Sequence, residues 1–408
     1  MSDAAVGPLH GMTVIEVASF IAGPYAGMLL SDLGAMVIKV EAPGDGDPFR
    51  GWDTGGDSPA FWAYNHGKQS ITLNLRKPAA LDIMRRLVET ADVVLENMRP
   101  GAMDRLGLGY QAVSAINPRL VYASVTGFGS SGPYRDRPAY DGIGQALSGL
   151  LSLLSERSSI QPTGPNFSDS LAGLFAAYGI LGALVARGQT GLGQHVETSL
   201  VASSLAFLVA PATETLAGAP APGPMSRPTA SQTYAWLASD GLALTVHLSS
   251  PPKFWEGLAR AVGRADLLDD PRFHTRLARR AHYAELRDEL AAVFRTRPRQ
   301  EWLERLLEYD VPCAPVYDLE EVFADPQVQH LGLRAAVPRK ERAAIETLRS
   351  PLEYSSTPVP APGPPPALGE QTESILQRLG YSAEAVKALR QAGVIAAPGD
   401  QEDRGKLN

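Results

Sequence analysis

The sequence predicts an α/β fold in which a large domain with an open, mostly parallel sheet precedes a smaller α+β domain. Two observations predict this class. Strand-like and helix-like runs alternate through the first part of the chain, and a proline-rich stretch then interrupts the alternation. Alternating strands and helices are typical of a parallel sheet covered by helices, because a helix is the usual connection between parallel neighbours.

The elements of the first part follow in a regular order. Short runs rich in Val and Ile indicate buried strands, and longer apolar runs indicate helices. In chain order they are strand 12–17, helix 24–33, strand 36–41, strand 70–75, helix 79–89, strand 92–97 and strand 120–126.

Proline-rich stretches indicate where the domain boundaries lie. Residues 217–231 (AGAPAPGPMSRPTAS) contain four prolines, and this composition disfavours both helix and strand. We therefore predict a first domain over residues 1–216, a linker over 217–231 and a small α+β domain over 232–328. Residues 329–408 form a C-terminal segment with a second proline-rich stretch and one amphipathic helix.

Charge and composition exclude several classes of function. The 37 Lys and Arg against 44 Asp and Glu leave a net charge of −7, so we expect no nucleic-acid partner. A single cysteine, Cys313, and seven scattered histidines provide no metal-ligand pattern, so we expect no metal. The longest weakly polar run, 171–186, is shorter than the roughly 20 residues that span a bilayer, and no secretory leader is recognisable. We expect a cytoplasmic protein without a membrane partner.

A glycine-rich string, GFGSSG at 127–132, follows a predicted strand and matches the spacing of dinucleotide-binding loops. Pro133 and Pro138 flank the next residues, so no helix opens there to hold a pyrophosphate. We expect a flexible loop beside a ligand site, without a bound nicotinamide or flavin.

Asp169 stands directly before residues 171–187, whose only charge is Arg187. A run this apolar predicts a helix that is buried on all sides. In one interpretation Ser168 or Asp169 caps that helix. In the other, Asp169 is a carboxylate nucleophile, and the positive helix end opposes the rise in pKa that burial causes and so preserves the charge.

A basic cluster lies beside the predicted ends of strands. Lys68, Arg76, Arg99 and Arg105 fall where open α/β sheets bind phosphorylated ligands, although a solvated surface explains basic residues equally well.

Six strings resemble a known family in the family's own order. They are GMTVIEVASFIAGPYAGMLLSDLGAMVIKVEAPGDGDPFR, NHGKQSITLNL, ADVVLENMRPGAMDRLGLGY, NPRLVYASVTGFGSSGPY, SDSLAGLFAAYGILGAL and GLGQHVETSL. The chain resembles the class III CoA-transferases of the CaiB/BaiF type, which include formyl-CoA:oxalate, carnitine and succinyl-CoA:glutarate CoA-transferases. The resemblance implies a large domain with a Rossmann-like sheet, to which the C-terminal segment returns, and an interlocked homodimer.

The resemblance also implies the roles of individual residues. Asp169 would be the catalytic carboxylate, forming a mixed anhydride and then an aspartyl-CoA thioester. The substrates would be an acyl-CoA and a small carboxylic acid, with no metal and no tightly bound cofactor. The residues matching CoA-binding positions of the family are Ile21, Ala22, Leu73, Asn74, Leu75, Arg76, Asn97, Met98, Arg105, Tyr140 and Asp141.

The chain also departs from the family pattern. Ile21 and Ala42 stand where some relatives have polar and basic side chains, and GPMSRPTAS replaces the glycine-rich loop of the oxalate enzymes. Oxalate is therefore not the expected substrate, and a dicarboxylate such as succinate is preferred. Candidate contacts for the acceptor acid are Arg227, Tyr234 and His247, with Arg227 facing a distal carboxylate.

Two other functions stay open. An acyl-CoA racemase shares the fold but needs a second acid or base, and racemases have histidine where this chain has Tyr140. A tyrosine with a pKa near 10 is a poor substitute at neutral pH. The other alternative is a catalytically silent CoA-binding protein.

Overall fold

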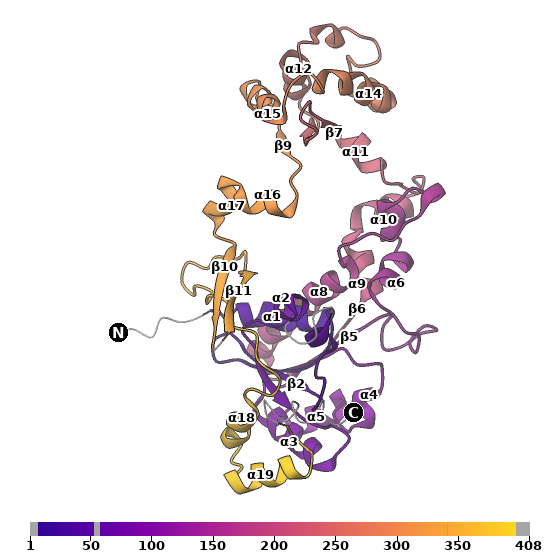
Figure 1. The fold of residues 1–408 in the computed structure, drawn as a ribbon. Helices are drawn as coiled ribbons and strands as arrows, with labels where there is room; N and C mark the ends of the chain where they lie inside the picture. Colours follow the sequence, from indigo (N-terminus) through magenta and orange to yellow (C-terminus); the bar gives the residue numbers. More distant parts are fainter. Residues whose placement is uncertain (1–6, 53–57, 341, 397–408) are drawn as a thin grey trace, which may run out of the picture. The chain divides into compact units, whose positions relative to one another are not determined.

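A computed structural model describes residues 7–52, 58–340 and 342–396 (Figure 1). Residues 1–6 of the predicted first domain and 397–408 of the predicted C-terminal segment lie outside the described residues. The described chain forms two units. Unit 1 contains residues up to 151, 162–212 and the chain from 332 onward, and unit 2 contains 152–161 and 213–331.

A six-stranded sheet organises unit 1. Its strands are β1 (Thr13–Val17), β2 (Met36–Glu41), β3 (Gln69–Thr72), β4 (Val93–Glu96), β5 (Val121–Thr126) and β6 (His195–Ser199). They pair in the order β3-β2-β1-β4-β5-β6, and every pairing is parallel. The predicted α/β class is confirmed, with two smaller antiparallel sheets in addition.

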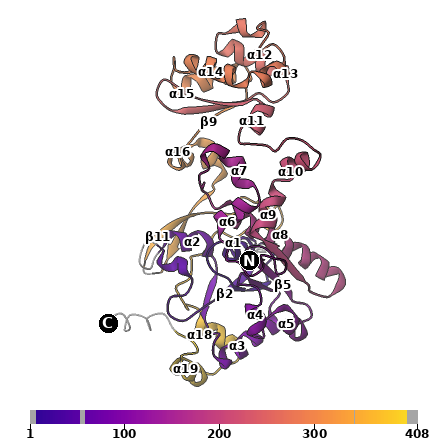
Figure 2. The same ribbon diagram turned by 90° about the vertical axis from the view of Figure 1, so that its right-hand side faces the viewer.

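Helices cover both faces of this sheet. Helices α1 (Ala22–Asp32) and α8 (Phe167–Thr190) pack on one face, and α3 (Pro78–Thr90), α18 (Thr372–Arg378) and α19 (Ala383–Gln391) pack on the other (Figures 1 and 2). Neighbouring strand residues therefore enter different cores: Val14 packs with α1 and α8, whereas Ile15 packs with α3. Burial on both faces explains why central strands such as β4 and β5 read as mainly apolar runs.

Shorter elements complete unit 1. They are the 3₁₀ turn η1 (Pro48–Gly51), α2 (Pro59–Asn65), α4 (Ala102–Arg105), α5 (Tyr110–Ile116), α6 (Asp141–Leu147), α9 (Leu200–Phe207) and the antiparallel hairpin of β10 (Arg334–Arg339) and β11 (Arg342–Leu348). Helices α7 (Leu150–Leu154) and α10 (Val209–Leu216) lie at the limits of the unit.

Helix α8 differs from the prediction in its exposure. One face is buried through small residues such as Ala172 and Ala176, but Leu174, Tyr178 and Val185 are 50%, 72% and 67% exposed. The expectation of burial on all sides is therefore wrong for the single chain, because only one side of α8 faces α1 and the sheet. Among the described residues, α8 is the one helix long and apolar enough to cross a membrane by length and composition.

Unit 2 has its own core around an antiparallel sheet of β7 (Thr233–Leu237), β8 (Ala243–His247) and β9 (Cys313–Pro315). Its helices are α11 (Ser226–Ser231), α12 (Pro252–Ala261), α13 (Arg276–Ala281), α14 (Tyr283–Phe294), α15 (Arg299–Glu308), α16 (Leu319–Ala324) and α17 (Pro326–Leu331). The segment 217–231, expected to have no helix, thus contains α11, because its prolines cluster before Ser226 and the later Pro228 lies in the first turn, where no N–H partner is needed.

Candidate active site

The strand order places a ligand site between β1 and β4. The order reverses at this pair, so the chain leaves the two strands in opposite directions and opens a crevice at their carboxyl ends. One side chain ties the two loops together: Asn97 Oδ1 accepts a hydrogen bond from the Ser19 N–H at 3.0 Å, and Asn97 Nδ2 donates to the Ser19 carbonyl at 2.8 Å.

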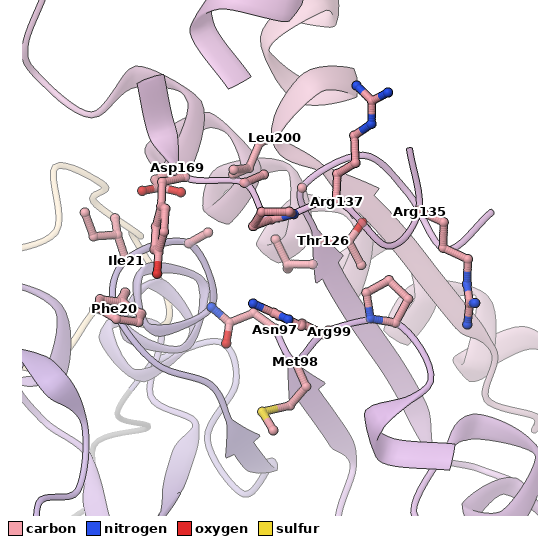
Figure 3. Close-up of a pocket in the computed structure, with 17 residues that line it drawn as sticks. Phe20, Ile21, Asn97, Met98, Arg99, Thr126, Arg135, Arg137, Asp169 and Leu200 are labelled. Carbon is pink, nitrogen blue, oxygen red and sulfur yellow. The ribbon is translucent and has the colours of Figure 1, made fainter. Parts of the chain in front are cut away.

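A cavity of about 240 Å³ lies at this crevice and contains Asp169. Figure 3 shows Asp169 and Leu200 on one side of the cavity, with Asn97, Arg99 and Met98 on the other. Asp169 is in the first turn of α8 and is half-buried. The cavity therefore brings an acid on a core helix to the loops that follow β1 and β4.

Asp141 caps the start of α8. Its Oδ1 accepts hydrogen bonds from the backbone N–H groups of Ser168 at 2.8 Å and Asp169 at 3.2 Å, and its Oδ2 accepts one from Gln145 Nε2 at 2.6 Å. Gly144 allows α6 this close, because a Cβ there would lie 2.8 Å from the Ser168 Cβ. The cap interpretation of Ser168 or Asp169 is thus wrong, since a carboxylate from another helix takes that role.

The Asp169 carboxylate is consequently free of hydrogen bonds within the described ranges. Burial, and to a smaller extent the nearby charge of Asp141, raises the pKa of Asp169 to about 7. The positive end of α8 does not keep the pKa of Asp169 at its ordinary value, because Asp141 already accepts the hydrogen bonds of the first N–H groups there. The raised pKa makes the Asp169 carboxylate a stronger base than that of an ordinary aspartate.

Nine of the eleven predicted CoA-binding residues line two neighbouring cavities. Ile21, Ala22, Asn97, Met98 and Tyr140 line the cavity of Asp169. Leu73, Asn74, Leu75 and Arg76, again with Met98, line a second cavity of about 650 Å³ beside β1 and β2.

Two predicted CoA-binding residues line neither cavity. Arg105 is the last residue of α4, and Asp141 caps α8 without lining either cavity.

Lys68 does not belong to a phosphate site, which corrects the prediction for the basic cluster. Its Nζ is fully buried 2.7 Å from Glu16 Oε2 and donates hydrogen bonds to the Pro24 carbonyl and to Asn65 Oδ1. Burial lowers the pKa of Lys68 to about 8 although Glu16 opposes that change. Sequence position suggested a strand end, but the side chain points into the core.

Phe20, Arg135 and Arg137 are among the lining residues of the Asp169 cavity that sequence reasoning missed. Arg135 Nε donates to the Ser130 carbonyl at 2.9 Å, and the Arg137 guanidinium lies 3.7 Å from the Tyr134 ring centroid. The sequence signal for the two arginines was their place shortly after the glycine-rich loop.

The glycine-rich loop itself is as predicted. No helix follows Gly132 directly, and the next helix, α6, begins at Asp141.

The suggested acceptor-acid residues all belong to unit 2. Tyr234 is buried and its ring stacks on Tyr283 with centroids 4.4 Å apart, so it is a core residue. Arg227 is on α11, and His247 ends β8 with Nδ1 3.2 Å from Thr233 Oγ1. Within the described ranges no group of three or more His, Cys, Asp or Glu side chains could hold a metal ion.

Comparison with known proteins decides the family. The model of "CoA-transferase family III" matches residues 9–372, which include every residue of both cavities. The chain belongs to CoA-transferase family III. It is therefore an enzyme, a CoA-transferase, whose substrates are CoA thioesters.

Individual relatives agree with this assignment. A succinate–glutarate CoA-transferase of Agrobacterium fabrum is 35% identical, with 91% of this chain and 96% of the relative covered. A formyl-CoA:oxalate CoA-transferase of Streptomyces avermitilis is 33% identical, with 95% and 99% covered. The crystal structure of a CAIB/BAIF family protein from Brucella suis superposes with a TM-score of 0.82 at 34% identity, covering 92% of this chain and 100% of that one. The family III transferase fold thus extends over both units.

Proposed function

We propose that this family III CoA-transferase transfers CoA from an acyl-CoA donor to a carboxylic acid, with Asp169 as the nucleophile. The observation that carries the proposal is a half-buried carboxylate that accepts no hydrogen bond in the described ranges and lies in a cavity at the β1–β4 crevice. A carboxylate without hydrogen bonds keeps its lone pairs available for attack on a thioester.

The reaction balances without any added acid or base. An Asp169 oxygen attacks the acyl carbon, the carbon–sulfur bond breaks, and CoA leaves as a thiolate from the mixed anhydride. The thiolate then attacks the aspartyl carbonyl carbon, which releases the donor acid and leaves an aspartyl-CoA thioester. The acceptor carboxylate repeats these steps in reverse order and restores Asp169. No proton is consumed, so the residues around Asp169 need only orient the reactants and exclude water.

The two cavities support a position for CoA. The larger cavity, with Leu73–Arg76 on its wall, is of a size to take the nucleotide end, and Met98 joins it to the cavity of Asp169. Arg76 and Arg105 are the proposed phosphate contacts predicted from sequence. Arg99, Arg135 and Arg137 add positive charge to the Asp169 cavity, and we include them among the proposed phosphate contacts.

We propose a dicarboxylic acid, such as succinate, among the substrates. The 35%-identical relative is named for succinate and glutarate, and three arginines line the cavity together with one carboxylate, that of Asp169. An excess of positive charge favours a second carboxylate on the acid. The contact of Arg227 with a distal carboxylate stays a prediction.

The proposed assembly is an interlocked homodimer in the cytoplasm. The apolar side chains that α8 and α9 expose, among them Leu174, Tyr178 and Phe207, support a partner chain on this face. A single cysteine is consistent with a reducing compartment.

Mass spectrometry of the purified enzyme with a panel of acyl-CoA and acid pairs tests the proposal. We expect the mass of the CoA ester to change to that of the acceptor's ester, with succinyl-CoA among the productive donors. Free CoA accumulating with every pair, and no new ester, would contradict the transferase mechanism.

A further inference from the structure

Aromatic rings form one side of the cavity that contains Asp169. The Phe20 ring meets the Tyr140 ring edge-on with centroids 6.0 Å apart, and it meets the Phe49 ring edge-on at 5.6 Å. Phe20 and Tyr140 both line the cavity with Asp169. We refer to Phe20, Phe49 and Tyr140 as the aromatic wall.

Phe20 has a backbone conformation that needs support. Its φ of +65° lies in the left-handed region, which side chains other than glycine rarely adopt. Such strain persists only where the surroundings hold the residue, and it concentrates at functional sites. The position of the wall therefore depends on the contacts that fix the Phe20 backbone.

Asp47 supplies the central contact. Its Oδ1 accepts hydrogen bonds from the N–H of Phe20 at 3.3 Å and from the N–H of Phe49 at 3.0 Å. One carboxylate oxygen thus joins two residues of the wall that are 29 positions apart in the chain.

Lys39 fixes Asp47 in turn. Lys39 Nζ lies 2.9 Å from Asp47 Oδ2 and 2.9 Å from Glu16 Oε1, and all three side chains are fully buried. Lys39 Nζ also donates to the Ala18 carbonyl at 2.8 Å, just before the Phe20 turn. Separating a buried ion pair leaves uncompensated charges, so moving Asp47 away from Lys39 is energetically costly.

We propose that Asp47 is a positioning residue for CoA transfer, acting through Phe20. It holds the Phe20 ring in place beside Tyr140, and the half-buried Phe20 ring keeps water away from the anhydride and thioester formed on Asp169. The inference rests on the proposed function, because only a transfer reaction has intermediates that water would divert. Hydrolysis of either intermediate would release free CoA, so the wall sets the ratio of hydrolysis to transfer.

A double-mutant cycle on the full chain tests this role. The variants are F20G, which removes the ring and suits the left-handed backbone, D47N, and the double variant. S382A is the matched control, because Ser382 also caps a helix in unit 1, at Ala385 N–H, without lining either cavity. The readout is free CoA released per CoA ester transferred, measured with saturating succinyl-CoA and glutarate so that a change in KM does not enter.

We expect F20G and D47N each to raise this ratio roughly tenfold. The double variant should match F20G alone, because Asp47 acts through the Phe20 ring, and S382A should keep the wild-type ratio. A wild-type ratio in folded F20G overturns the proposal, whether or not D47N folds, and additive effects in the double variant overturn the role of Asp47. If the wild-type protein transfers no CoA with any acyl-CoA and acid pair of the panel, the proposed function fails instead.

Discussion

Asp141 accepts a hydrogen bond from the backbone N–H of Asp169 at 3.2 Å, so one acid caps the helix that presents the other. The arrangement leaves the Asp169 side chain unbound and places a second negative charge near it. Both burial and this charge raise the pKa of Asp169, to about 7. The site thus contains a carboxylate that is more basic, and a better nucleophile, than an ordinary aspartate.

Replacement of Asp169 by Asn should abolish CoA transfer and stabilise the protein at alkaline pH. The folded-state pKa near 7 exceeds the unfolded value of 3.8, so the protonated folded form is favoured at low pH and this contribution is lost as the pH rises to 7. Asn carries no charge and avoids the cost, which is roughly 2–4 kcal/mol at pH 8. Urea unfolding should therefore show a larger difference between variant and wild type at pH 8 than at pH 5. Equal differences at both pH values would contradict the raised pKa.

The pH profile of the acyl-CoA half-reaction should follow the ionisation of Asp169. Only the carboxylate attacks, so kcat/KM should rise about tenfold per pH unit below pH 6 and level off above about pH 8. D141N keeps an acceptor oxygen for the helix cap but removes one cause of the shift, so the inflection should move to lower pH.

Glu96 provides the control for this profile. Burial also raises the pKa of Glu96 to about 7, and its Oε2 accepts a hydrogen bond from the Met98 N–H at 2.7 Å. E96Q retains an acceptor oxygen, so its inflection should stay at the wild-type position. An inflection that disappears in E96Q and is unmoved in D141N would assign the ionisation to Glu96.

Removal of the proposed phosphate contacts should weaken binding more than chemistry. R76A and R105A should each raise KM for the CoA ester more than they lower kcat, because remote charges are bound equally in the ground and transition states. R85A is the matched control, since Arg85 pairs with Asp82 on the exposed face of α3. Steady-state kinetics at low salt measure the effect. Unchanged KM values in both variants would place the diphosphate elsewhere.

The enzyme should exchange CoA without racemising its substrate. Racemases have histidine where this chain has Tyr140, which is 66% exposed and whose ring contacts Phe20. In deuterated water, a chiral 2-methylacyl-CoA should keep its α-hydrogen, whereas succinyl-CoA with an acceptor acid should form a new ester. Deuterium at the α-carbon without CoA exchange would favour the racemase. Exchange with monocarboxylates alone would remove the dicarboxylate proposal.

The exposed face of α8 should be an interface between two copies of the chain. Tyr178→Glu and Leu174→Glu place charge on that face, so they should shift the protein from dimer to monomer in sedimentation velocity experiments. Met36→Glu, at an exposed apolar residue on β2, is the control and should sediment as the wild type. A wild-type protein that sediments as a monomer at micromolar concentration would contradict the proposed homodimer.

The sequence alone predicted five of the six strands of the parallel sheet, without β6, and a helix beginning beside Asp169. Buried strands and helices leave periodic apolar patterns within a few residues, and such patterns depend on neighbours in the chain. The parallel sheet, the loops after Val17 and Glu96, and the helix beginning near Asp169 were all readable in this way. The roles of Asp169 and of the CoA-binding residues came from family resemblance and stay predictions.

Only the tertiary structure decided which charged groups meet. Asp141 reaches the start of α8 from 28 residues away, Lys68 is buried against Glu16, and Arg135 and Arg137 line the cavity of Asp169. These contacts depend on burial and on partners that are distant in the sequence. Burial and partners together determine the pKa of each charged side chain and whether that side chain can reach a ligand. The exposed side of α8 could not be predicted for a similar reason. An apolar run predicts that a helix face is covered, but it does not show whether residues of the same chain cover it.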